Sequence, residues 1–394
     1  MRSSGFRSFL KFTPFILSFT LFTNAYAVNQ YILTDLGTLG GNDSFAYGIN
    51  NLGQVVGYAN NNSNQELAFI WQNGVMTANY SWGLIGVNQS YAYNINDNSY
   101  CVGTYYSVGS TPRAYAAKDG TLAATFSGEG YAYDINNQNE MIVRINGQLQ
   151  YKNLDTAAIT SLGSLTTATA INDNAQVVGG SVMWDNGTFT QLGDLGSGNT
   201  KASDINNSTQ VVGQSYYQPG FQHAFKWNTT DGMVDLGTIG GTISAANAIN
   251  ESGLIVGWAR NESASLRATL WDGTGAYDLT NLVTNLTGWS HLSEARDINE
   301  QGQIVGFGVT DSGAKHAFLL TPVPAADGDL APLGNPDGIV NAADLIIMTR
   351  LVLGTLTATP LELEHGDLYP EGAPDGIINT SDMIRLLKII QNAP

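Results

Sequence analysis

The chain has 394 residues, enough for two or three domains, and a formal net charge of −17 at pH 7. Such an acidic chain lacks the basic surface that nucleic acid requires and is unsuited to anionic membrane surfaces. Its single cysteine, Cys101, leaves no partner for an intramolecular disulfide, and we expect it to be a small buried hydrophobe.

The first 27 residues have the pattern of a secretory signal peptide. Three basic residues (Arg2, Arg7 and Lys11) precede a short apolar run, Phe12–Phe22, and Ala25-Tyr26-Ala27 forms a small-x-small cleavage site. No later stretch is apolar for long enough to cross a bilayer, so we expect no membrane insertion. The sequence therefore predicts a secreted protein, extracellular or at the cell surface, with the periplasm as the alternative.

The segment 28–321 consists of repeats built around an Ile-Asn pair. The pair occurs seven times, each time with Ala three positions earlier, at Ile49, Ile95, Ile135, Ile171, Ile205, Ile249 and Ile298. Six positions after each Ile begins a β-branched run such as Val55-Val56-Gly57, followed by an Ala-Phe-x-Trp segment and a Leu-Gly turn. The third copy departs from this pattern, because Val143 stands where Gly is expected. Four short apolar runs separated by Gly and Asn predict four strands per repeat, with the Asn residues in turns.

The repeat length predicts a closed ring. Six intervals separate Ile49 from Ile298, about 41 residues each, which is the size of a β-propeller blade. The alternative is an open β-solenoid, whose coils are usually shorter. The seventh repeat lacks a final Asp-Leu-Gly strand, while Tyr31–Gly37 supplies one before the first repeat. We therefore expect a mainly β fold, a seven-bladed propeller in which the N-terminal strand completes the seventh blade.

These repeats resemble the HAF-repeat family of bacterial extracellular proteins, with His223-Ala224-Phe225 and His316-Ala317-Phe318 as the characteristic triplets. The resemblance covers about residues 31–320 and implies export. It implies no activity. Because the two histidines share one repeat position, we expect them to serve the fold.

After a Pro/Ala linker at 322–328, two acidic segments repeat at a fixed offset, so that Asp329 corresponds to Asp367. Each contains the pattern D-G-x-x-N-x-x-D and runs into an apolar-periodic segment, Ala343–Gly354 or Ser381–Gln391, which predicts a helix. The pattern matches positions 5, 6, 9 and 12 of an EF-hand-type calcium loop, and the alternative is two acidic turns that cap helices.

The duplicated loop-helix resembles dockerin modules over residues 329–394. The resemblance implies a small α-helical module with two Ca²⁺ sites and a cohesin-like protein partner. Ligands of the first loop, Ile339 through its carbonyl, would be Asp329, Asn335, Asp337, Ile339, Asn341 and Asp344. Those of the second, Ile377 through its carbonyl, would be Asp367, Asp375, Ile377, Asn379 and Asp382. In both loops four extra residues separate position 1 from position 5, and Glu371 could compete for the first position of the second loop. Ala373 replaces Asn335, so we expect the second site to be weaker.

No metalloprotease, serine-hydrolase or phosphate-loop motif is present in the sequence. We therefore expect a non-catalytic, monomeric binding protein whose loops after the Val-Val-Gly strands contact a glycan or a protein. The aromatic candidates for that contact are Tyr105, Tyr106, Tyr216, Tyr217 and Trp258, and neighbouring aromatic residues at the same face are Tyr58, Trp82, Phe221 and Trp289. The alternatives are a polysaccharide-degrading glycosidase or lyase, for which distant carboxylates would have to meet in the channel, and a purely structural surface protein.

Overall fold

The computed structural model describes residues 30–78, 86–323, 330–331, 340, 342–368 and 376–392. The predicted signal peptide lies outside these residues. Among them, none of the helices has the length and apolar character that crossing a membrane requires.

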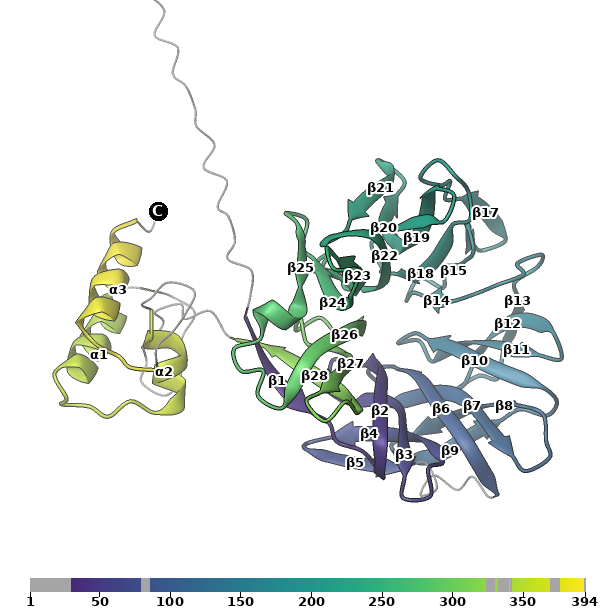
Figure 1. Ribbon diagram of the computed structural model, residues 1–394, viewed down its shortest axis with the longest axis horizontal. Helices are drawn as coiled ribbons and strands as arrows, with labels where there is room; N and C mark the ends of the chain where they lie inside the picture. The colour runs from purple at the N-terminus through teal and green to yellow at the C-terminus, as the bar shows by residue number, and fades with distance from the viewer. Residues whose placement is uncertain are drawn as a thin grey trace, which may run out of the picture.

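The propeller predicted from the repeats is confirmed: seven four-stranded antiparallel sheets follow one another around a ring (Figure 1). Blade one contains β2 (Gly40–Ile49), β3 (Val55–Asn61), β4 (Glu66–Gln72) and β5 (Val75–Ala78). Blade two contains β6 (Val87–Ile95), β7 (Tyr100–Ser107), β8 (Arg113–Lys118) and β9 (Thr121–Thr125). Blade three contains β10 (Gly130–Ile135), β11 (Glu140–Ile145), β12 (Gln148–Asn153) and β13 (Ile159–Ser161). Blade four contains β14 (Ala170–Ile171), β15 (Val177–Gly179), β16 (Val182–Asp185) and β17 (Thr188–Gln191).

The remaining blades follow the same order. Blade five contains β18 (Lys201–Ile205), β19 (Val211–Gln218), β20 (Phe221–Asn228) and β21 (Gly232–Gly237). Blade six contains β22 (Gly240–Ile249), β23 (Ile255–Asn261), β24 (Leu266–Trp271) and β25 (Ala276–Asp278), followed by a 3₁₀ turn, η2 (Leu279–Leu282). Blade seven contains β26 (Trp289–Ile298), β27 (Ile304–Thr310), β28 (Lys315–Pro322) and, from the start of the chain, β1 (Tyr31–Asp35).

Closure by the N-terminal strand is also confirmed. Strand β1 pairs with β28 in register, from Tyr31 opposite Pro322 to Asp35 opposite Phe318. Seven buried apolar clusters lie between consecutive blades, and one of them joins blade seven to blade one through Val305, Leu319 and Val55. Each blade therefore buries both faces, and the closed ring leaves no inter-blade face open.

The glycine of the Val-Val-Gly run has a steric cause. A Cβ on Gly57 would lie 1.9 Å from the Phe45 carbonyl oxygen of the inner strand, and one on Gly213 would lie 2.1 Å from that of Lys201. Only glycine permits this approach. Val143 takes the position in blade three, where it is fully buried in the core between blades two and three.

The C-terminal part is small and helical, as predicted. It contains α1 (Ala342–Val352), α2 (Pro360–Gly366) and α3 (Thr380–Asn392), of which α2 was not expected. Thr359 and Glu362 form a capping box at the start of α2. A core of Leu330, Met348, Leu351, Leu368 and Leu386 holds the part together.

Candidate functional site

The seven Asn residues of the Ile-Asn pairs form a closed ring at one end of the central channel. In blade one, Asn50 Oδ1 accepts the backbone N–H groups of Leu52 and Gln54, which confirms the predicted turn. Its Nδ2 donates to the Asn96 carbonyl oxygen of the next blade at 2.9 Å. The same bond recurs at each joint and returns to the start, donated in turn by Asn96, Asn136, Asn172, Asn206, Asn250 and Asn299.

The residues that follow these asparagines form a second ring. Each donates its backbone N–H to a side-chain oxygen of the next blade, as Asn51 does to Asp97 at 2.8 Å. The members are Asn51, Asp97, Asn137, Asp173, Asn207, Glu251 and Glu300. Together the two rings surround a shallow cavity of about 160 Å³ at the channel mouth.

Three buried aspartates stand one position before the Ile of their repeats. Asp134, Asp204 and Asp297 each accept the N–H of the Ile in the following blade, at 2.7, 2.9 and 2.8 Å. Burial raises the pKa of Asp134 to about 7, that of Asp204 to about 6 and that of Asp297 to about 8. Distant carboxylates thus do come together around the channel, but each one joins two blades.

An aromatic wall lines the inner edge of blades seven, one and two. We use this name for Phe45, Tyr47, Tyr58, Tyr91, Tyr93, Tyr106 and Phe307. The Tyr47 ring lies 5.9 Å from that of Tyr93, and the Arg296 guanidinium lies 5.1 Å from the Tyr47 ring. Tyr47 therefore contacts blades on both sides of its own. Two pairs of these residues flank the buried repeat Ala, in Phe45-Ala46-Tyr47 and Tyr91-Ala92-Tyr93, a signal that was present in the sequence.

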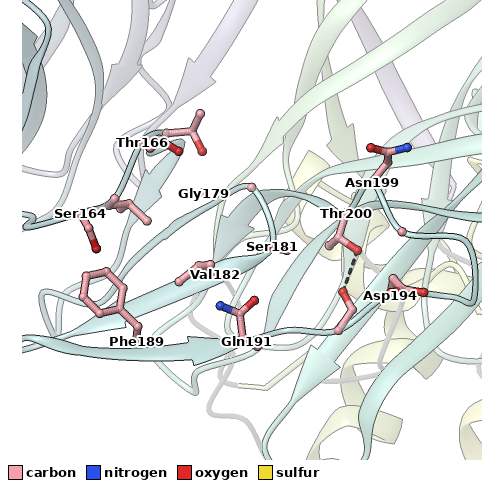
Figure 2. Close-up of a pocket in the computed structure, with 15 residues that line it drawn as sticks. Ser164, Thr166, Gly179, Ser181, Val182, Phe189, Gln191, Asp194, Asn199 and Thr200 are labelled. Atoms are coloured by element: carbon pink, nitrogen blue, oxygen red, sulfur yellow. Dashed lines mark hydrogen bonds between the residues drawn. The ribbon is translucent and has the colours of Figure 1, made fainter.

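A cavity of about 750 Å³ lies between blades four and five. Figure 2 shows Ser164 and Phe189 at one side, Asn199 and Thr200 at the other, and Ser181 and Gln191 between them. The Phe189 ring is 41% exposed. Among the described residues no hydrogen bond of the protein engages the side chains of Gln191 and Asn199, which leaves both amides available to a ligand.

The chain positions this cavity by shortening blade four. In blade one the second and third strands pair Val55 with Trp71, 16 positions apart, whereas blade four pairs Val177 with Trp184, seven positions apart. The hairpin turns at once through Gly180, which has a φ of +59°, and both Gly180 and Ser181 line the cavity. This difference in spacing is visible in the sequence, whereas the aromatic content of the loops does not indicate it.

The predicted aromatic ligand residues are dispersed. Tyr105 is 8% exposed and packs in the core between blades one and two, and Trp289 is likewise buried, so neither is available as a surface contact. Tyr58 and Tyr106 both belong to the aromatic wall, where each ring contacts Tyr91. Tyr217 packs against His223 on blade five, with Tyr216 beside it in β19, while Trp258 lies in β23 of blade six. Trp82 lies outside the described residues.

The other singled-out residues of the propeller serve the fold. Cys101 is buried between blades one and two, as expected, and burial raises the pKa of its thiol to about 12. His223 and His316 each contact the Asp of an adjacent strand in their own blade, Asp235 and Asp35, at 2.8 Å.

In the helical part, three of the proposed calcium ligands are buried: Asp344, Asp367 and Asp382 are 0%, 2% and 0% exposed. Asp344 Oδ1 accepts the N–H groups of Leu330 and Ala331 at 2.7 and 2.8 Å. Asp382 Oδ1 accepts that of Leu368 at 2.8 Å, the same contact one repeat later. In each loop, the Asp at the last ligand position therefore lies against the residue that follows the Asp at the first ligand position.

The second loop supplies three further contacts. Asp367 Oδ2 accepts the N–H of Gly376, whose φ is +79°. Asn379 Oδ1 accepts the N–H of Ser381 and Asp382 Oδ2 accepts that of Asn379, so these two residues also cap α3. Ile377 is exposed. Asp329, Asn335, Asp337, Ile339, Asn341 and Asp375 lie outside the described residues. Among the described ones, no three His, Cys, Asp or Glu side chains are grouped so that they could hold a metal ion.

No protein-family model and no curated protein matches the chain. Solved structures share the propeller architecture at low identity. The extracellular domain of a proposed one-component system from B. thetaiotaomicron is 12% identical over 79% of this chain and 43% of its own, with a TM-score of 0.48. The propeller domain of the Trilobed protease from Pyrococcus furiosus is 8% identical over 74% of this chain and 95% of its own, with a TM-score of 0.49. The chain thus spans less than half of the first of these structures.

Proposed function

We propose that the protein is a secreted, non-catalytic binding protein whose propeller binds a glycan in the cavity between blades four and five. The observation that carries the proposal is the lining of that cavity: exposed amides and hydroxyls surround one exposed ring, Phe189. Sugars present hydroxyl groups at their edges and C–H groups on their faces. Neutral hydrogen-bonding groups with an aromatic surface match both.

Binding is favoured over hydrolysis by the charges of this cavity. Asp194 is the one carboxylate among its described lining residues. Glycoside hydrolysis ordinarily uses two carboxyl groups on opposite sides of the scissile bond. The buried aspartates of the channel do not supply the second, because they are engaged in joints between blades.

The C-terminal part would attach the protein to a partner. We propose that it is a dockerin-like module with two Ca²⁺ sites, the second weaker, and that a cohesin-like protein binds it. Support comes from the repeated contact of Asp344 and Asp382 with the residues after Asp329 and Asp367. In the second loop this contact places Asp382 against the residue next to Asp367, in spite of the four extra residues. The Gly376 N–H, donated to Asp367, fits the sharp turn of a calcium loop.

The test of glycan binding is a screen of immobilised polysaccharides with the full chain, followed by calorimetry of any ligand found. We expect Phe189→Ala to weaken binding at least about fivefold through the loss of ring contact, and Gln191→Ala to weaken it less. Val108→Ala, which removes an 84% exposed apolar side chain elsewhere, is the matched control.

Three results would count against this proposal. Loss of binding in a Tyr216→Ala, Tyr217→Ala double variant, with Phe189→Ala unaffected, would move the site to the aromatic loops of blade five. Release of reducing ends from a bound polysaccharide by the pure protein would favour an enzyme. If no polysaccharide binds, a structural surface protein becomes the better description.

A further inference from the structure

A second cavity of about 400 Å³ lies on blade three, next to the one just described. Its described lining is Glu129, Tyr131, Tyr133, Arg144 and Gly147. It has the same origin as the larger cavity. Blade three also has a short middle hairpin, in which Ile145 pairs with Gln148 across a turn at Asn146 and Gly147. Shortened hairpins in two consecutive blades thus leave two cavities along one side of the ring.

Thr166 connects the two cavities. Arg144 Nη2 donates to the carbonyl oxygen of Thr166 at 2.5 Å, and Thr166 itself lines the larger cavity (Figure 2). One short segment, Ser164–Thr167, therefore borders the larger cavity and holds the guanidinium of the smaller one. A ligand that extended past this segment would occupy both.

The smaller cavity differs in chemistry from its neighbour. The Tyr131 and Tyr133 rings are stacked, with centroids 6.5 Å apart and an angle of 23° between their planes. Arg144 makes no ion pair among the described residues, although Glu129 lines the same cavity. Its Nε is buried without a hydrogen-bond partner among those residues, so a ligand would meet the outer nitrogens of the guanidinium. In a chain with 16 Lys and Arg against 33 Asp and Glu, a guanidinium without a carboxylate partner is available to an anion.

We propose that the two cavities are adjacent subsites for one linear glycan and that the sugar in the blade-three cavity carries an anionic group, a uronate carboxylate or a sulfate ester. This inference rests on the glycan-binding function proposed above. Tyr131 and Tyr133 offer aromatic surface to the sugar, and Arg144 pairs with its anion. The net charge of −17 disfavours a chain charged at every unit, so the ligand alternates anionic and neutral sugars.

The experiment compares the full chain and its variants on matched ligands by calorimetry. The probes are hexasaccharides of hyaluronan, in native and carboxyl-reduced form, and of chondroitin sulfate, in native and desulfated form. If the screen identifies another anionic polysaccharide, its native and neutralised forms replace them. Arg144→Gln removes the cation, Arg144→Lys retains it, and Arg260→Gln removes an exposed arginine on blade six as the control.

We expect Arg144→Gln to weaken binding of the anionic form about tenfold or more, as for a lost charge-assisted hydrogen bond, and to leave the neutralised form unchanged. Arg144→Lys should recover part of this loss. Phe189→Ala should weaken both forms, since it acts at the neutral subsite. Carboxyl reduction and desulfation distinguish a uronate from a sulfate as the source of the charge.

Two outcomes would overturn the inference and leave the glycan function intact: equal effects of Arg144→Gln on the charged and neutralised forms, or no effect on either. Absence of binding by every native and neutralised glycan would instead refute the function itself. Binding of a poly-glutamate peptide with the same Arg144 dependence, and of no glycan, would replace the ligand class.

Discussion

His316 and Asp35 lie 281 positions apart in the chain, yet Nδ1 of the histidine is 2.8 Å from Oδ2 of the aspartate. His223 and Asp235 make the same contact within blade five, only 12 positions apart. The N-terminal strand thus occupies the place that the fourth strand takes in a blade formed by one repeat.

Removal of Tyr31–Gly37 should therefore open blade seven at its outer edge. We expect the shortened protein to unfold at a lower temperature with a broader transition, because β28 loses the backbone partners that β1 supplies and Tyr31 leaves the core. Calorimetry compares it with a protein that begins at Val28. Identical melting curves would show that β1 contributes nothing to closure.

The stability of the propeller should fall as the pH rises from about 4 to about 8. The folded pKa of Asp297, about 8, lies above its ordinary value of 3.8, so the folded state holds this proton over the interval while the unfolded state releases it. The contribution of Asp297 to the free energy of unfolding is complete below its pKa in the unfolded state. It is lost as the pH rises through its pKa in the folded state. Asp134 and Asp204 act in the same sense.

Asp297→Asn tests this cause. Asn94 holds the equivalent position in blade two and accepts the N–H of Ile95 in its own strand, so an amide at position 297 can keep the bond to Ile298 while Ile49 loses its acceptor. We expect the lost bond to lower the melting temperature relative to the parent, by at least about 2 °C less at pH 8.5 than at pH 5, because only the parent loses stability by releasing a proton. Asp311→Asn, at an exposed position, is the control. An equal shift at both pH values would point to altered packing in place of titration.

Asn206→Asp should weaken the asparagine ring. The aspartate keeps the oxygen that accepts the Gln210 N–H, but an oxygen replaces the Nδ2 that donates to the Asn250 carbonyl. Leaving that buried acceptor unpaired should lower the free energy of unfolding by about 1–3 kcal/mol at pH 7. Urea denaturation measures the change, with Asn62→Asp in an exposed loop as the reference. Equal stability of the two variants would remove any role for the ring bond.

Calcium should bind the full chain with a stoichiometry of two, and Asp337→Ala should reduce affinity more than Asp375→Ala, because Ala373 already weakens the second loop. Extracellular calcium modules often have dissociation constants of about 10⁻⁴ to 10⁻³ M, so the calorimetric titration needs millimolar calcium. Asp311→Ala controls for the loss of one exposed carboxylate. No heat of binding, or unchanged binding in both loop variants, would leave Asp344 and Asp382 as helix-capping residues only.

The ring could be predicted from the sequence because its cause is local and repeated. The Ala, Ile and Val positions of the repeat make the same contacts between blades around the ring, so their spacing alone identifies the blades. The missing Leu-Gly strand at the end of the repeats likewise indicated β1 as the closing strand.

The cavities could not be predicted in this way, because they arise where the repeat is broken. Their lining depends on the absence of hairpin residues in blades three and four, and on Arg144 and Thr166, which occupy no common repeat position. The aromatic content of the loops did not indicate the cavities, because an aromatic residue such as Tyr105 can pack in the core instead of lying at the surface. The shorter sequence separation of Val177 and Trp184, compared with that of Val55 and Trp71, would have been the better signal of a cavity.

The asparagine ring also bears on how such a chain can change over generations. Each repeat carries both halves of the inter-blade hydrogen bond. Its Asn side-chain amide donates to the next blade, and its Asn carbonyl oxygen accepts from the blade before. The same hydrogen bond could form in a ring of any number of blades. We therefore infer that the packing angle between neighbouring sheets sets the number at seven. A repeat added by in-frame duplication would bring the donor and the acceptor of its own inter-blade hydrogen bond. The blade formed from both ends of the chain would still close the ring.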